Sequence, residues 1–305
     1  MTEKQWLISI NSNNYKMRLK HQLKTSFQHL YLKTKFYFHN FRDKHQLNIV
    51  FLIGCGRSGT TILGQTIGNH HDVTYLNERR DIWHKVYPEF DIWSGKEKQP
   101  KLVVRSEDSS VSKDKRLNKL FLIEQVGKNG KVLLEKLPTN SFRLEYLNKA
   151  FPNAKYIYLQ RNGLEVAKSI EPLIKKGKWL GKNDLKWQQL DKLVAKDPLL
   201  KTEKFSDYEK GLIEWRFSMQ YSEEFFKNFD QSRYHSLTYD EFMNNPQIAL
   251  HRIFNFLDLE TSNNLLNTFS TEINRRSNVL DFVTERELFI AGDNLKRFVS
   301  SNNKK

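Results

Sequence analysis

The sequence predicts an α/β protein in which helices cover both faces of a central parallel sheet, giving three layers, α/β/α. Short runs that are nearly continuously apolar alternate with segments of helical periodicity, and such runs are typical of parallel strands buried on both faces. The first run, residues 48–53, leads into a glycine-rich loop and then a helix, which is how a βαβ unit begins. A basic, helical N-terminal extension of residues 1–46 is predicted before the main domain of residues 47–305.

The order of patterns along the chain predicts the remaining elements. A second strand ends near Asn77, just before Glu78. Further strands are predicted over residues 131–136, 154–161 and 233–239, and helices over residues 60–70, 140–150, 164–175, 208–229 and 246–257. Residues 175–207 are rich in lysine and lack a strand pattern, which fits either a lid or acceptor-facing insertion over the site or a solvated helical excursion.

Composition limits the partners and the compartment. The 305 residues carry a formal net charge of +15, which indicates an anionic partner such as nucleic acid, phospholipid, polyanionic glycan or a phosphorylated cofactor. Cys55 is the one cysteine in the sequence, so a disulfide framework is excluded. The chain lacks a run of about 18 apolar residues and an apolar signal-peptide core at its start. We therefore expect a cytoplasmic protein.

The N-terminal extension has its own charge pattern. The first 50 residues contain nine Lys or Arg and two acidic residues, with aromatic and aliphatic side chains between them at roughly helical spacing. One interpretation is an amphipathic helix that makes peripheral contact with an anionic membrane surface. The other is a helix that packs on the main domain and keeps its charged face in water.

The loop "GCGRSGTT" (residues 54–61) has the glycine spacing of a nucleotide-triphosphate loop but not its lysine. Thr60 stands where that lysine would reach the terminal phosphates, and Arg57 is the cation of the loop. Inward-facing N–H groups, the N-terminus of the following helix and the hydroxyls of Thr60 and Thr61 still suit an anion. A phosphate that carries a sulfuryl group has less need of a divalent cation than a triphosphate, so no metal is expected.

"GRSGTT" after a buried strand resembles the 5′-phosphosulfate loop of sulfotransferases that use 3′-phosphoadenosine 5′-phosphosulfate (PAPS), which have a P-loop-like fold. The arginine is typical of the carbohydrate and tyrosylprotein branches. "RNGLEVAKS" (residues 161–169) resembles the family's 3′-phosphate motif, and the two motifs occur in the family's order. The resemblance spans residues 48–259. It implies that PAPS is held by Gly56, Arg57, Ser58, Gly59, Thr60, Thr61, Arg161 and Ser169.

Sulfuryl transfer to a hydroxyl requires a base near the acceptor oxygen and cations around the transferring group. Glu78 follows Arg57 by 21 residues and resembles the catalytic glutamate of the same two branches. Lys136 ends a strand before Leu-Pro and resembles the lysine that steadies the sulfuryl group. The resemblance therefore implies that Glu78 takes the acceptor proton, while Lys136 and Arg57 stabilise the charge that develops.

The residues alone leave other assignments open. Glu78 would also fit a surface carboxylate paired with Arg79 or Arg80, two arginines that would suit an anionic acceptor. A histidine base would be one of His70, His71 and His84. Two late basic residues, Arg275 and Arg276, would reach the cofactor from the C-terminal region.

The expected function is PAPS-dependent sulfuryl transfer to a hydroxyl of a glycan or glycolipid, because the resemblance implies that tyrosylprotein acceptors require a secretory compartment, for which we find no signal in the sequence. Four tryptophans would also offer rings on which sugars stack, although packing in the core is the commoner use of tryptophan. Those tryptophans are Trp83, Trp93, Trp179 and Trp187. One alternative is a nucleotide-triphosphate-dependent kinase, which the missing lysine disfavours. The other is a non-enzymatic anion-binding protein on a membrane surface or on nucleic acid. That alternative does not explain the paired motifs around Arg57 and Arg161, so nucleic acid is not an expected partner.

Overall fold

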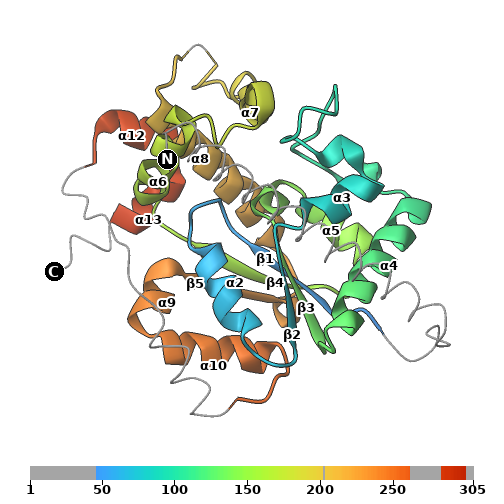
Figure 1. Ribbon diagram of the computed structural model, residues 1–305. Coiled ribbons are helices and arrows are strands. Elements are labelled where there is room, and N and C mark those ends of the chain that lie inside the picture. The colour runs from blue at the N-terminus through green and yellow to red at the C-terminus, as the bar shows by residue number, and fades with distance from the viewer. Residues whose placement is uncertain (1–45, 202, 262–282, 300–305) are drawn as a thin grey trace, which may run out of the picture. The chain divides into compact units, whose positions relative to one another are not determined.

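A central parallel sheet organises the described part of the chain, residues 46–201, 203–261 and 283–299 of this computed structural model (Figure 1). Its strand order is β2-β3-β1-β4-β5, and all four pairings are parallel. The strands are β1 (Ile49–Ile53), β2 (Val73–Asn77), β3 (Val132–Lys136), β4 (Lys155–Gln160) and β5 (Tyr234–Thr238). The predicted parallel α/β fold is therefore confirmed.

Helices connect the strands and cover both faces. They are α2 (Thr60–Gly68), α3 (Arg80–Val86), α4 (Val111–Gly127), α5 (Leu144–Ala150), α6 (Gly163–Lys175), α7 (Leu185–Val194), α8 (Asp207–Phe226), α9 (Tyr239–Asn244), α10 (Pro246–Phe256), α12 (Glu285–Ala291) and α13 (Lys296–Val299). Short 3₁₀ turns occur at Pro88–Phe90, Ser106–Asp108, Pro138–Phe142, Lys182–Asp184, Gln231–Arg233 and Asp293–Leu295.

The alternation of side chains along β1 separates two hydrophobic cores. Phe51 and its neighbours at every second position face a core shared with α4, α5, α6 and α8. Val50 and Leu52 face the opposite core, which is built with α2, α9 and α10. Because both faces are covered, all five residues of β1 are buried, and this explains its continuously apolar sequence.

The strand order places the chain's chemistry at one edge of the sheet. The connection after β1 leads past β3 to β2 on one side of the sheet, whereas the connection after β3 leads past β1 to β4 on the other side. Crevices of this kind, outside the carboxyl ends of parallel strands, are where open α/β sheets bind ligands. Four parts of the predicted site lie at this edge: the loop 54–59 after β1, Glu78 after β2, Lys136 at the end of β3 and Arg161 after β4.

One long helix, α4, was not predicted. Its sequence carries many lysines and other polar residues, and they obscure the apolar spacing of the side chains that face the core. Leu117 and Phe121 are four residues apart and fully buried, so they anchor α4 to the sheet.

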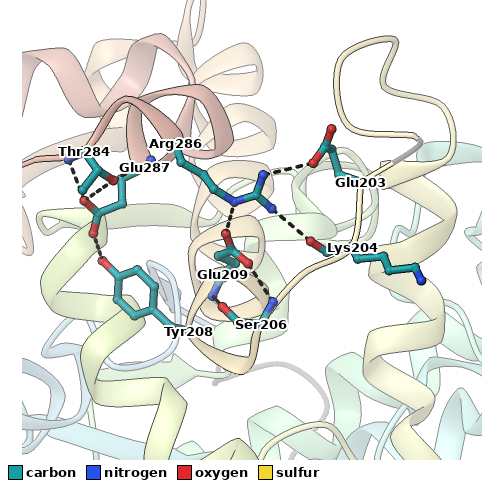
Figure 2. Close-up of polar contacts among 8 residues, drawn as sticks. All are labelled: Glu203, Lys204, Ser206, Tyr208, Glu209, Thr284, Arg286 and Glu287. Carbon is teal, nitrogen blue, oxygen red and sulfur yellow. Dashed lines mark hydrogen bonds and ion pairs between the residues drawn. The ribbon is translucent and has the colours of Figure 1, made fainter.

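The C-terminal segment is fastened to the start of α8 (Figure 2). Arg286 on α12 donates to Glu203, 3.0 Å away, and forms an ion pair with Glu209. The Tyr208 hydroxyl donates to Glu287 at 2.6 Å. These contacts join α12 to α8 and to the chain that enters α8.

Several sequence predictions fall outside the described residues. They concern the extension 1–46 (apart from Gln46) and the basic pair Arg275 and Arg276. Within the described residues, the helices are too short or too polar to cross a bilayer.

Candidate active site

The glycine-rich loop between β1 and α2 forms a tight cradle. Gly59 has a φ of 95°, a left-handed conformation that precedes α2 and favours glycine. A Cβ added to Gly56 would lie 2.6 Å from Cη2 of Trp179, so a larger residue does not fit there. No side chain caps the described N-terminus of α2, which leaves its first N–H groups available to an anion.

Arg57 at the top of the loop contacts the second predicted motif directly. Its Nε donates to Ser169 Oγ at 3.0 Å, across 112 residues of sequence. The Arg161 guanidinium donates to the backbone oxygen of Arg57 at 3.2 Å. The two motifs expected to bind the two ends of PAPS are therefore in contact.

Arg161 is held from several sides. Its Nε lies 2.8 Å from Glu165 Oε2, and its guanidinium carbon lies 4.1 Å from the centre of the Tyr239 ring. The Trp215 indole donates to the backbone oxygen of Arg161 at 2.9 Å. These partners fix the guanidinium next to the loop, and the sequence motif alone indicated none of them.

The second group of polar contacts centres on Lys136. Its Nζ lies 2.8 Å from Glu78 Oε1 and 3.0 Å from Thr61 Oγ1, and its side chain is 1% exposed. Glu78 Oε2 accepts from Arg80 at 2.7 Å. Lys136 thus joins the predicted base to the phosphate loop.

Strand pairing explains why Glu78 lies beside Lys136. Asn77 at the end of β2 pairs with Lys136 at the end of β3, and the Glu78 N–H donates to the Lys136 backbone oxygen at 2.8 Å. Glu78 has a φ of 51°, an uncommon conformation for a residue with a side chain. Such strain is typical of functional sites, where neighbouring contacts hold the residue in place.

The environment keeps Glu78 ionised. Burial favours the protonated carboxyl, but the hydrogen bond and charge of Lys136, followed by Arg80, outweigh it and lower the pKa of Glu78. Burial lowers the pKa of Lys136, and Glu78 partly offsets this effect. The site therefore holds a carboxylate between two cations.

The other charged residues considered from sequence lie differently. Arg79 pairs with Asp81 at 2.8 Å and Glu124 at 3.1 Å, whereas Arg80 contacts Glu78. Arg80 is therefore the arginine that pairs with Glu78. Glu78 also contacts the buried Lys136, which an ordinary surface carboxylate would not do.

The three histidines have other partners. His70 Nε2 lies 2.9 Å from the Glu260 backbone oxygen, and its Nδ1 accepts from the Asp72 N–H. His71 is 76% exposed, and His84 lies 3.4 Å from Asp91. None of these described contacts joins a histidine to Glu78 or to the loop. The group formed by His70, His71 and Asp72 has the composition of a metal site, but the ring nitrogens of His70 are already engaged.

The tryptophans proposed as sugar platforms pack against protein groups. Trp83 is buried and donates to Glu135 at 2.9 Å. Arg80 lies over Trp93, Trp179 packs on the loop, and Trp187 contacts Phe205. Trp83 is therefore not a platform for a sugar, whereas Trp93, Trp179 and Trp187 are half-buried and have protein partners.

Two cavities lie outside the phosphate loop. The larger, about 610 Å³, is bounded by α8, the end of α7 and residues 103–105, and none of the predicted site residues lines it. A small cavity of about 20 Å³ lies beside Arg80 and is also lined by Thr139 and Arg143. Among the described residues, Arg80 Nε, Thr139 Oγ1 and Arg143 Nε are buried donors without a hydrogen-bond partner.

The chain resembles known sulfotransferases. A family model described as "Sulfotransferase family" matches residues 49–263. The chain is 24% identical to chicken protein-tyrosine sulfotransferase 2 over 234 residues, which cover 74% of this chain and 55% of that protein. It is 21% identical to the Drosophila melanogaster protein-tyrosine sulfotransferase over 70% of this chain and 38% of that protein. The chain thus spans about half or less of the length of these curated relatives.

Solved structures support the fold. Sulfotransferase STF9 from Mycobacterium avium aligns with a TM-score of 0.55 and 14% identity, covering 90% of this chain and 81% of that chain. The sulfotransferase domain of the Synechococcus PCC 7002 olefin synthase aligns with a TM-score of 0.51 and 16% identity, covering 86% and 98%.

Proposed function

The chain belongs to the sulfotransferase family, and on that premise we propose that it transfers a sulfuryl group from PAPS to an acceptor hydroxyl. One observation carries the proposal: the glycine-rich loop 54–61 contacts both sets of predicted site residues. Arg57 contacts Ser169 at one end of the loop, and Thr61 contacts Lys136 and through it Glu78 at the other.

The described residues fit PAPS as a donor. Because Gly56 and Gly59 have no side chain, a phosphate in the loop would approach the backbone closely. The first turn of α2 offers N–H groups to the same phosphate. Arg161 and Ser169 would hold the 3′-phosphate, while Arg57 lies between that group and the loop. When bound, PAPS supplies a sulfuryl group whose sulfur–oxygen bond to the 5′-phosphate breaks as a new bond to the acceptor oxygen forms.

Glu78 is the base in this proposal. It accepts the proton that the acceptor hydroxyl gives up when its oxygen bonds to sulfur. The cations Lys136 and Arg80 keep the Glu78 carboxylate ionised and fixed, and Lys136 also balances charge that develops at the loop. In-line transfer requires the acceptor oxygen and the sulfuryl group to be held in fixed positions, and the contacts that fix Glu78 beside the loop support this part of the proposal.

For the acceptor, we propose a tyrosyl hydroxyl in an acidic peptide. The two relatives named above are protein-tyrosine sulfotransferases. Arg80 contacts Glu78 and its side chain is 41% exposed, so its guanidinium suits a carboxylate close to the reacting hydroxyl. A glycan or glycolipid acceptor is the competing proposal. A cytoplasmic location and membrane contact through residues 1–46 stay predictions.

A thermal-shift comparison tests the donor. The product nucleotide, 3′,5′-adenosine bisphosphate, should raise the melting temperature because it binds the folded state. ATP with magnesium should raise it less. Stabilisation by ATP with magnesium alone would support the kinase alternative and end the sulfotransferase proposal.

A paired assay tests the acceptor. Purified protein with PAPS is given either a tyrosyl peptide flanked by aspartate and glutamate or the same peptide with asparagine and glutamine in their place. Sulfation that favours the acidic peptide supports the proposal. Sulfation of glycan or glycolipid hydroxyls in parallel reactions, with both peptides unmodified, supports the competing acceptor.

A further inference from the structure

We propose that Lys186 and Glu214 are a buried positioning pair that holds the phosphate loop and the base in one frame. The inference rests on the proposed function and extends it to two residues outside the recognised motifs. Lys186 belongs to α7, in the lysine-rich segment 175–207, and Glu214 lies within α8.

The pair is unusually well buried for two charges. Lys186 Nζ lies 2.5 Å from Glu214 Oε1, and the two side chains are 2% and 4% exposed. A buried ion pair contributes little net stability compared with apolar residues of similar volume. A role in geometry would account for a pair that adds little stability.

One connection runs from the pair to the phosphate loop. The Trp179 indole donates to Glu214 Oε2 at 2.7 Å, and Lys186 Nζ lies 4.2 Å from the centre of the Trp179 ring. The edge of that ring lies against Gly56, where an added Cβ would be 2.6 Å from Cη2. Trp179 is thus fixed by the pair and supports the loop from beneath.

A second connection runs from the pair to the base. Lys186 Nζ lies 4.9 Å from the centre of the Trp93 ring, and the Arg80 guanidinium carbon lies 4.1 Å from it. Arg80 in turn donates to Glu78 at 2.7 Å. The Trp93 ring therefore connects the buried cation to the arginine that orients Glu78.

The backbone brings the two connections together. The Lys182 N–H donates to the Trp93 backbone oxygen at 2.9 Å, and the Lys186 N–H donates to the Leu180 backbone oxygen at 2.8 Å. The Trp93 and Trp179 rings meet edge to face, with centres 6.5 Å apart. A displacement of Lys186 would therefore be transmitted to both the loop and the base.

The test uses the double variant Lys186→Met/Glu214→Gln, which removes both charges, keeps similar volumes and leaves an acceptor for Trp179. We expect kcat to fall about 10- to 100-fold, the cost of a small misplacement of reacting groups. The acid limb of the kcat/KM profile should move to higher pH, because Arg80 no longer holds Glu78 as firmly. Unchanged kcat together with an unchanged acid limb would overturn the proposal.

A second, mostly buried ion pair provides a matched control, and one of its members lies on α8 with Glu214. Arg216 pairs with Asp197 at 2.6 Å, with side chains 13% and 12% exposed, and neither contacts the loop or Glu78. The variant Arg216→Met/Asp197→Asn should lower the melting temperature and leave kcat and the acid limb unchanged. An equal loss of kcat in this control would also overturn the proposal, because any lost ion pair would then have the same effect.

Two further comparisons keep the result decisive. If the double variant does not fold, Trp93→Leu takes its place; it should lower kcat and shift the acid limb, and an unchanged limb would overturn the proposal. The wild-type protein is assayed alongside. If the wild type neither binds 3′,5′-adenosine bisphosphate nor transfers sulfuryl groups, the proposed function itself is refuted. If the wild type is active and the double variant is equally active, only the positioning pair is refuted.

Discussion

Lys136 Nζ lies 2.8 Å from Glu78 Oε1, although 58 residues separate them in the sequence. The parallel pairing of β2 and β3 creates this contact, because Lys136 ends β3 opposite Asn77 and Glu78 follows Asn77 directly. Lys136 also contacts Thr61 at 3.0 Å. A single buried cation therefore connects the proposed base with the proposed phosphate site.

Replacing Glu78 with glutamine should remove the base and keep the fold. We expect the transfer rate to fall about 10²- to 10⁴-fold, the usual contribution of a positioned general base. Binding of 3′,5′-adenosine bisphosphate should persist, since Glu78 is not among the residues proposed to hold phosphate. Single-turnover kinetics and a nucleotide titration on the same preparation measure the two effects. Full activity in this variant would show that Glu78 is not the base.

Replacing Lys136 with methionine should change the pH dependence. In the wild type, the cation beside Glu78 lowers the pKa of its carboxyl below the ordinary value of about 4.3. The stabilising contact is thus present above that value and is lost as pH falls through the folded-state pKa. Without Lys136, the pKa of Glu78 should rise, and the acid limb of the residual activity should move to higher pH. Carboxyl titration followed by NMR checks the direction, and an unchanged or lower pKa would contradict it.

Replacing Ser169 with alanine should weaken recognition of the 3′-phosphate selectively. The variant removes the hydroxyl that accepts from Arg57 and that would donate to a phosphate. A lost hydrogen bond to a charged group corresponds to about 1.5–3 kcal/mol, so affinity for 3′,5′-adenosine bisphosphate should fall about tenfold or more. Affinity for AMP, which has no 3′-phosphate, should stay the same. Equal losses of affinity for both nucleotides would show that Ser169 does not recognise the 3′-phosphate.

Replacing Gly56 with alanine should disturb the loop through Trp179. The added methyl group would lie 2.6 Å from Cη2 of that ring, and such overpacking costs about 1–3 kcal/mol. The melting temperature should fall, along with nucleotide binding. The double variant Gly56→Ala/Trp179→Leu should regain part of the lost stability. No recovery in calorimetry would mean that the ring does not limit the size of residue 56.

The strands and the loop could be predicted because each carries a local signal. Residues 49–53 are continuously apolar, and the glycines after them predict a phosphate loop. Lys136 and Arg161 both directly follow or end a strand, so their position at the carboxyl edge follows from the parallel sheet. The resemblance to a family supplied their proposed roles.

The supporting contacts could not be predicted, because they depend on packing between distant segments. Trp215 hydrogen-bonds to Arg161, 54 residues earlier, and Trp179 packs on Gly56. Lys186 is one of many lysines in a stretch whose sequence fits either a lid or a solvated helix, yet it is buried with Glu214. A charge in a helical segment gives no local sign that its partner lies on another helix.

Mass spectrometry of an acceptor incubated with PAPS tests the central claim most directly. An acidic tyrosyl peptide is incubated with the wild type, with Glu78→Gln and with Lys136→Met, and the transferred sulfuryl group is located by its mass. We predict modification of the tyrosine by the wild type and almost none by either variant, although all three are stabilised by 3′,5′-adenosine bisphosphate. Wild-type protein that binds the nucleotide but sulfates neither this peptide nor glycan or glycolipid hydroxyls, or variants as active as the wild type, would contradict the account.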